Sequence, residues 1–213
     1  IGRAHAELQS QSNLVCRLLL EKKGEDKRYH IYDHRSNNLM KIAIVSGSPR
    51  KLSKTIHVMS HVHDYLNNKS YHLDLIDLAD ENIEMYHGSN EDYNQTTKEL
   101  INKLTEADIW IIGTPIYNSF FSSAIKNAFE FLNYKNTSGK VAGLIIVASD
   151  HISFKSVQTN LTQLMSYFGV LTNPNSVYIT VDKIDEISRL TIELKLRLEN
   201  ILDETIRLFE ESK

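Results

Sequence analysis

The chain has 213 residues, of which 41% are hydrophobic and 24% charged, with a formal net charge of -3. This is an ordinary globular composition with room for one α/β domain, and it gives no basic field that would favour nucleic acid as a partner. Every apolar run is far shorter than the roughly 20 residues that span a bilayer. The single cysteine, Cys16, excludes an internal disulfide framework and any multi-cysteine metal site. We therefore expect a cytoplasmic protein that binds neither nucleic acid nor a membrane.

Met40 divides the sequence. Residues 1–39 are polar at both ends and sustain no helical period, although VCRLLLEKK and KRYHIYDH flank Gly-Glu-Asp as the arms of a short β-hairpin would. From Met40 the chain reads MKIAIVSGS, which is how many α/β domains begin. We expect 1–39 to be an N-terminal extension, as a tag, a fusion remnant or upstream translated sequence, and 40–213 to be the main domain. A genuine small accessory element is the alternative.

From residue 41 on, strand-like and helical patterns alternate. The expected strands are 41–46, 71–78, 108–115, 139–149 and 176–181. The expected helices are 53–68, one around 100–104, 122–132, 157–169 and a long charged one at 185–213. Continuous apolar strands alternating with helices predict a doubly wound five-stranded parallel sheet with helices on both faces. Ligands of such sheets bind outside the carboxyl ends of the strands, where the strand order reverses.

The loop after the first strand reads IVSGSPRKLSKT and is dense in hydroxyl and basic side chains. A helix beginning near Ser53 presents unpaired N–H groups and the positive end of its dipole, which suits a phosphate. The loop is neither a Walker A loop nor a GxGxxG fingerprint. Its candidate phosphate ligands are Ser48, Arg50, Ser53, Lys54 and Thr55. The alternative is a plain helix cap by Ser53 with solvated basic neighbours.

Two further loops follow the third and fourth strands. Residues 114–123 are rich in aromatic side chains and would offer a flat surface and backbone N–H groups to a planar heterocycle. The alternative is a turn whose Tyr117, Phe120 and Phe121 cover the core or a subunit contact. Residues 149–153 form a polar loop in which His151 is a ligand contact, an acid or, most commonly for such a residue, a surface side chain.

GSPRKLSKT after the first strand and TPIYNSFFSSAIKNAFEFL after the third together resemble the NADPH-dependent FMN reductase family of flavodoxin-like proteins. The patterns of that family run roughly GSxRxxSxT and TPEYNxSxPGxLKNxxDWL. GKVAGLIIVASD, followed by a helix ending in YFGV, is also similar to the family, so that the resemblance covers about residues 41–182. It implies a flavodoxin-like fold that binds FMN and takes electrons from NADPH or NADH.

The resemblance also implies roles for individual residues. Ser48, Arg50, Ser53 and Thr55 would hold the FMN phosphate. The flavin ring would be lined by Pro115, Ile116, Tyr117 and Asn118, with Ser119 and Phe120 beside it. Ser149, Asp150 and His151 would approach the other end of the ring. No side chain is expected as an obligatory acid or base, because the flavin carries the chemistry.

Three segments depart from the family pattern. Ile116 stands in place of an acidic residue, and Phe121-Ser122-Ser123 replaces a Pro-Gly turn. Asp150-His151 replaces the glycine pair expected after the fourth strand. The phosphate end is therefore the closer match.

The resemblance implies a homodimer or higher homo-oligomer with Phe120, Phe121 and Phe129 near the interface. It implies a small-molecule electron acceptor, which is a free flavin, a quinone, an azo or nitro compound, or a metal oxyanion. The alternatives are a flavodoxin-like electron carrier without NAD(P)H activity and a binding module that has lost the flavin.

Other chemistry-bearing residues carry less weight. His57 and His61 have the i, i+4 spacing of a helical metal site, but no third ligand is evident, so we expect a solvated helix face and no metal. Cys16 has no identifiable base partner and is not expected to be a catalytic thiol. Trp110 lies in an apolar strand and is expected in the core or at an interface.

Overall fold

A six-stranded sheet organises the computed structural model, which describes residues 39–88, 92–184 and 189–213. Within this part of the chain the strands are β1 (Lys41–Ser46), β2 (His72–Asp77), β3 (Ile109–Tyr117), β4 (Phe120–Phe121), β5 (Val141–Ala148) and β6 (Leu171–Thr180). The order is β2-β1-β3-β5-β6 with every pairing parallel, while β4 pairs antiparallel with the end of β3. The predicted flavodoxin-like doubly wound sheet is confirmed.

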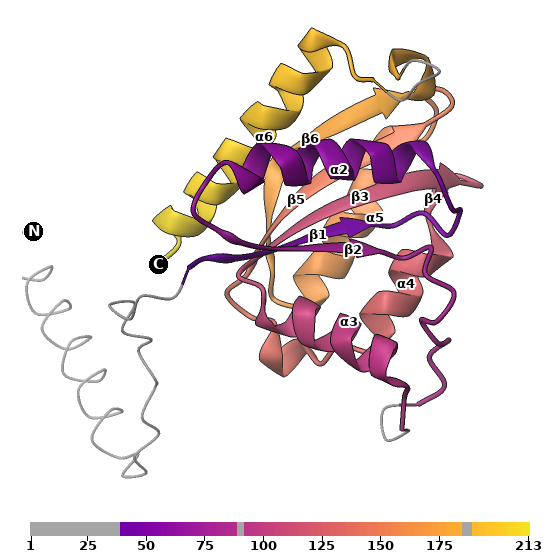
Figure 1. The fold of residues 1–213 in the computed structure, drawn as a ribbon, viewed down its shortest axis with the longest axis vertical. Helices are drawn as coiled ribbons and strands as arrows, with labels where there is room; N and C mark the ends of the chain where they lie inside the picture. The colour runs from indigo at the N-terminus through magenta and orange to yellow at the C-terminus, as the bar shows by residue number, and fades with distance from the viewer. Residues whose placement is uncertain (1–38, 89–91, 185–188) are drawn as a thin grey trace, which may run out of the picture. The chain divides into compact units, whose positions relative to one another are not determined.

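Five α-helices of the described chain cover the two faces of this sheet (Figure 1). They are α2 (Lys54–Asn67), α3 (Gln95–Glu106), α4 (Ser123–Glu130), α5 (Phe154–Tyr167) and α6 (Ile192–Glu211), with short 3₁₀ turns η1 (Tyr134–Asn136) and η2 (Val181–Lys183). Helices α2 and α6 pack on one face, and α3, α4 and α5 pack on the other.

The strands are apolar throughout because both faces are covered. Ile42 and Ile44 point to the α2 and α6 side, whereas Ala43 and Val45 point to the opposite side. Trp110 is fully buried on that second side, and its ring lies edge-on to Phe129 at 5.2 Å between centroids. A buried indole needs a hydrogen-bond acceptor, and this one donates to the carbonyl of Leu104 at 2.9 Å. Trp110 is therefore a core residue.

Several elements differ from the sequence-based expectation. The C-terminal helix α6 begins at Ile192 instead of residue 185, and Leu190 before it forms an antiparallel bridge with Ile184. The hairpin strand β4 was not predicted, and α5 begins at Phe154 instead of residue 157. Strand β6 begins at Leu171 instead of residue 176. Leu171 and Thr172 already pair with β5, and a bulge separates them from the next paired residue, Ser176. The bulge contains a proline, which a strand tolerates at the edge of a sheet.

The histidines of α2 do not form a uniformly solvated face. The His61 Nε2 is buried without a hydrogen-bond partner, and burial, followed by the nearby charge of Lys195 on α6, lowers the pKa of this side chain. Among the described residues no three His, Cys, Asp or Glu side chains gather as metal ligands.

The expected extension at 1–39 lies, apart from residue 39, outside the described residues, as does Cys16. Its nature stays a prediction. In the part of the chain that the structure describes, no helix has both the length and the apolar character needed to cross a membrane.

Candidate functional site

The loop between β1 and α2 is a tight turn built on serine side chains. The buried Ser48 Oγ accepts a hydrogen bond from the Arg50 backbone N–H at 3.2 Å. Ser53 is the N-cap of α2, and its Oγ accepts from the N–H of Ile56 at 3.2 Å. Thr55, in the first turn of α2, is 2% exposed. The loop thus sets the positive N-terminus of α2 at the carboxyl edge of the sheet, which is a favourable place for an anion.

A two-residue hairpin joins β3 to β4. Tyr117 pairs with Phe120, and the intervening Asn118 and Ser119 have φ values of 49° and 64°. Two consecutive left-handed residues define a type I′ turn, whose twist matches that of the paired strands. Phe121 then pairs with Ile116 and is buried, while Phe120 is 47% exposed. Phe121-Ser122-Ser123, which stand in place of the family's Pro-Gly turn, follow at the end of this hairpin.

The two loops and α4 meet at Gly47. Its N–H donates to the carbonyl of Gly113 in β3 at 2.7 Å, and its carbonyl accepts from the hydroxyl of Ser122, the N-cap of α4. A Cβ on Gly47 would lie 2.5 Å from the side chain of Ile125 and 2.7 Å from the carbonyl oxygen of Gly113. Only glycine fits this junction without displacing a neighbour.

A cavity of about 290 Å³ opens beside this junction. It is lined by Ser48, Arg50, Lys51, Leu52, Ser53, Lys54, Thr55, Pro115, Ile116, Tyr117, Val147, Ala148, Ser149 and Val181. The lining thus joins the ends of β1, β3, β5 and β6 at the edge where the strand order reverses between β1 and β3.

Nine of the fourteen residues expected at a flavin site line this one cavity: Ser48, Arg50, Ser53, Lys54, Thr55, Pro115, Ile116, Tyr117 and Ser149. Sequence reasoning missed Val147, Ala148 and Val181, because an apolar residue at a strand end cannot be told from core by its pattern. It also left out Lys51 and Leu52, which belong to the loop that it had recognised.

Five expected residues lie outside the lining. Asn118, Ser119 and Phe120 form the tip of the β3–β4 hairpin. Asp150 and His151 lie in the exposed loop after β5, where Asp150 Oδ1 accepts from the N–H of Ile152 at 2.8 Å and the His151 ring lies 6.0 Å from that of Phe154.

The cavity has two chemically different ends. At one end stand Arg50, Lys51 and Lys54 with the N-terminus of α2, and no Asp or Glu belongs to the lining. At the other end Pro115, Ile116 and Tyr117 face the apolar strand ends Val147 and Ala148. The guanidinium of Arg50 lies 5.2 Å from the centroid of the Tyr117 ring and so bridges the two ends.

This donor set fits FMN. A phosphate needs N–H and hydroxyl donors and positive charge, and the loop after β1 supplies all of these. Lys51 of this loop already pairs with Glu81 at 2.9 Å. A flavin ring needs flat apolar surface with a few polar groups at its edge. The apolar end of the cavity offers such a surface, and the hydroxyl side chain of Ser149 stands beside it.

Fold and cavity together define a flavodoxin-like protein with a phosphate-accepting loop. The model of the NADPH-dependent FMN reductase family matches residues 40–183, which is more than half of the chain. The chain belongs to this family.

Curated relatives agree with this assignment. An NAD(P)H-dependent FAD/FMN reductase of Geobacillus thermodenitrificans is 29% identical over 119 residues, covering 55% of this chain and 64% of the relative. An NADPH azoreductase of a Bacillus species is 29% identical over 110 residues, covering 51% of this chain and 59% of the relative. These alignments span less than two thirds of each relative.

Solved structures share the fold over more of their length. A flavoenzyme NAD(P)H:(acceptor) oxidoreductase of Paracoccus denitrificans superposes with a TM-score of 0.67 at 20% identity, covering 82% of this chain and 99% of that one. An apo NADH:FMN oxidoreductase gives 0.64 at 20% identity, covering 78% and 88%. At this identity the likeness establishes the fold alone.

The Gly47 junction can be tested by a double-mutant cycle. We expect Gly47→Ala to lower the free energy of unfolding by about 1–3 kcal/mol, because the added methyl group overpacks the site. Ile125→Ala removes the clashing side chain, although the contact with the Gly113 carbonyl oxygen remains. The double variant should therefore be destabilised by about 1 kcal/mol or more less than the sum of the two single variants. Urea denaturation of the four proteins measures this coupling.

The matched control combines Gly47→Ala with Leu198→Ala, a buried α6 residue in the core on the other face of the sheet. That pair should be additive. Additive costs for Gly47→Ala and Ile125→Ala would contradict the close contact described above.

Proposed function

We propose that the chain is an FMN-dependent NAD(P)H oxidoreductase. The observation that carries this proposal is the single cavity in which the phosphate-accepting loop and an apolar slot meet at the strand-order reversal. Membership of the NADPH-dependent FMN reductase family supports it. Bound FMN would supply the chemistry, accepting a hydride from NADPH or NADH and passing reducing equivalents to an acceptor.

The loop after β1 would bind the phosphate of FMN. The hydroxyls of Ser48, Ser53 and Thr55 and the N–H groups at the start of α2 would donate to the phosphate, and Arg50 and Lys54 would balance its charge. Because Ser48 is buried and Ser53 already caps α2, these donors are held in place before the ligand arrives. Such preorganisation reduces the entropy lost on binding.

The apolar end of the cavity would orient the flavin ring. Pro115, Ile116 and Tyr117 would lie along the ring and exclude water, with Ser149, Asp150 and His151 towards its other end. Backbone N–H groups near Asn118 and Ser119, fixed by the type I′ turn, would stabilise negative charge on the ring edge. No Asp, Glu or His lines the cavity, in keeping with a site that uses no side-chain acid or base.

The acceptor belongs to a set of small molecules: a free flavin, a quinone, an azo or nitro compound, or a metal oxyanion. An aromatic acceptor is supported by the names of two relatives, the FAD/FMN reductase and the azoreductase described above.

A homodimer or higher homo-oligomer in the cytoplasm completes the proposal. Of the three phenylalanines expected at an interface, Phe121 and Phe129 are buried in the chain's own core, so that only Phe120 is free to contact a second copy. A single cysteine in 213 residues suits a reducing compartment.

An electron carrier is the second candidate. An archaeal flavodoxin shares the fold with a TM-score of 0.55 at 11% identity, covering 81% of this chain and 99% of that one. A carrier would hold FMN without consuming NAD(P)H in steady turnover, and a binding module without flavin would hold none.

The phosphate loop can be tested by removing its donors. We expect Ser53→Ala and Arg50→Ala each to weaken FMN binding about tenfold or more, because each removes a hydrogen bond or ion pair to a charged group. Fluorescence quenching of FMN on titration with protein gives the dissociation constant.

Thr191→Ala is the control for the effect of losing a helix cap without losing a phosphate ligand. Thr191 caps α6 as Ser53 caps α2, with its hydroxyl accepting from the N–H of Leu194 at 3.2 Å, and it does not line the cavity. This variant should keep the wild-type FMN affinity. Unchanged affinity in both Ser53→Ala and Arg50→Ala would refute the phosphate assignment.

The oxidoreductase itself is tested by spectroscopy. After FMN addition and desalting, the protein should retain the visible flavin bands, and anaerobic NADPH or NADH should bleach them. Retained bands that neither nucleotide bleaches would favour the carrier. Absence of retained flavin together with absence of NAD(P)H oxidation at excess FMN would favour the module.

A further inference from the structure

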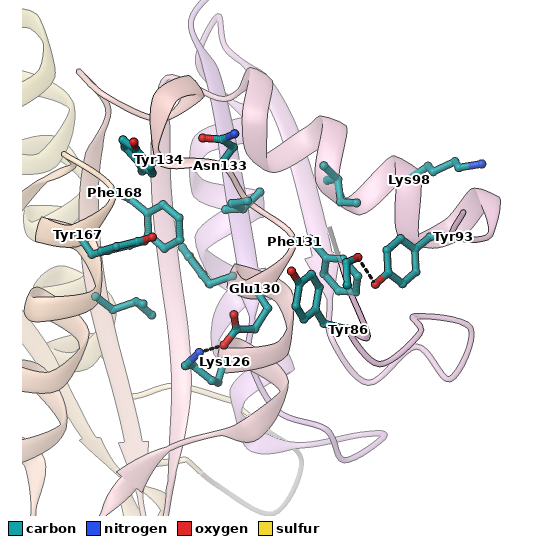
Figure 2. Close-up of a pocket in the computed structure, with 15 residues that line it drawn as sticks. Tyr86, Tyr93, Lys98, Lys126, Glu130, Phe131, Asn133, Tyr134, Tyr167 and Phe168 are labelled. Atoms are coloured by element: carbon teal, nitrogen blue, oxygen red, sulfur yellow. Dashed lines mark hydrogen bonds and ion pairs between the residues drawn. The ribbon is translucent and has the colours of Figure 1, made fainter. Parts of the chain in front are cut away.

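A second cavity, of about 800 Å³, lies on the face of the sheet covered by α3, α4 and α5 (Figure 2). Its volume falls within the range typical of small-molecule sites, which is about 300–1,000 Å³. It shares no lining residue with the candidate flavin cavity. The proposed function leaves this cavity unused.

Aromatic rings dominate its walls. On one side, Tyr167 lies edge-on to both Tyr134 and Phe168, with centroid distances of 6.0 and 5.1 Å. On the other side, Tyr86 and Tyr93 lie edge-on to Phe131, with distances of 5.5 and 4.9 Å. Figure 2 shows Glu130 between the two groups. Tyr134 and Tyr167 are more than half exposed, so a planar aromatic molecule would find stacking surface here.

The charges of the lining are already compensated. Lys98 pairs with Asp92 at 2.6 Å, and Lys126 pairs with Glu130 one turn later on α4. Neither lysine is a spare cation for an anionic ligand, and Glu130 is no spare anion for a cation. The cavity therefore matches a molecule without net charge.

Its uncharged polar side chains are phenols and the amide of Asn133, whose Oδ1 already accepts from the N–H of Lys135 at 3.0 Å. The Tyr93 hydroxyl is occupied, since it accepts from the N–H of His87 at 2.9 Å and donates to the carbonyl of Gly88 at 2.8 Å. Within the described part of the chain, the hydroxyls of Tyr86, Tyr134 and Tyr167 make no hydrogen bond to protein atoms. They are available as donors, and the matching group on a ligand is a carbonyl or similar acceptor.

We propose that this cavity is a second binding site, which takes a neutral planar aromatic molecule carrying a hydrogen-bond acceptor. Helix α4 connects it to the flavin cavity. Its N-cap, Ser122, bonds to Gly47, and its C-terminal half supplies Lys126 and Glu130 to the second cavity. The eight residues of α4 span about 12 Å. The two cavities are therefore separate, and α4 runs from the junction beside the first to the wall of the second.

The chain carries a reporter for this site. Trp110 is its one tryptophan, and its buried ring contacts Phe129 and Phe168, at 5.2 and 6.4 Å between centroids. Both phenylalanines line the cavity. The indole Nε1–H of Trp110 gives a single resolved peak in a ¹H–¹⁵N correlation spectrum, and ring currents from a bound aromatic molecule would shift it.

The test is a titration of the ¹⁵N-labelled full chain with coumarin, which is neutral, planar and carries a carbonyl, in the presence and absence of excess FMN. We expect a saturable shift of the Trp110 indole peak, with the same dissociation constant under both conditions. The readout needs neither bound flavin nor activity, so that it is independent of the proposed oxidoreductase function.

The variant Tyr134→Ala/Tyr167→Ala should bind coumarin at least tenfold more weakly. Because both residues are more than half exposed, this variant should still fold. Leu196→Ala, an exposed apolar residue on α6, is the matched control and should bind as the wild type does. An indole peak that does not shift saturably overturns the proposal. An unchanged dissociation constant in the double variant overturns it too, as does a self-association through Tyr134 and Tyr167 that excludes coumarin.

Discussion

The close contact at Gly47 is the constraint on which the candidate site depends. Three elements far apart in sequence reach this one residue: the end of β1, the middle of β3 through Gly113, and the start of α4 through Ser122 and Ile125. Because glycine has no Cβ, the backbone of the phosphate loop can approach β3 closely. The loop can therefore share a cavity with the residues at the end of β3. The phosphate end and the ring end of the site are thereby held in a fixed relation.

The two ends of the cavity then follow from ordinary rules of helix and sheet structure. A capped helix N-terminus and basic side chains gather at the loop after β1, while parallel strands end in apolar residues because both faces of the sheet are covered. The chain departs from the family pattern just after the hairpin turn at Asn118 and Ser119. Phe121, which pairs with Ile116, begins the segment Phe121-Ser122-Ser123 that replaces a Pro-Gly turn, and Ser122 of this segment is the N-cap of α4.

Much of this architecture could be predicted from sequence, because continuous apolar strands and capped amphipathic helices leave strong local patterns. The loop from Ser48 to Thr55 was recognisable because hydroxyl and basic residues rarely gather after an apolar strand by chance. The β4 hairpin was not recognisable from the sequence, since Asn-Ser is a weaker turn signal than Asn-Gly. Neither was the aromatic cavity, whose Tyr86, Phe131 and Tyr167 come from separate segments and meet only in the folded chain.

The central claim is that the loop after β1 binds a phosphate. The most direct test compares the affinities of the wild-type protein for FMN and for riboflavin, which lacks the phosphate. The cavity predicts that FMN binds at least about tenfold more tightly at low salt, because several donors and cations face an anion. Added salt should narrow this difference by screening the charges. Equal affinity for the two flavins would contradict the account, because the loop would then contribute nothing to recognition.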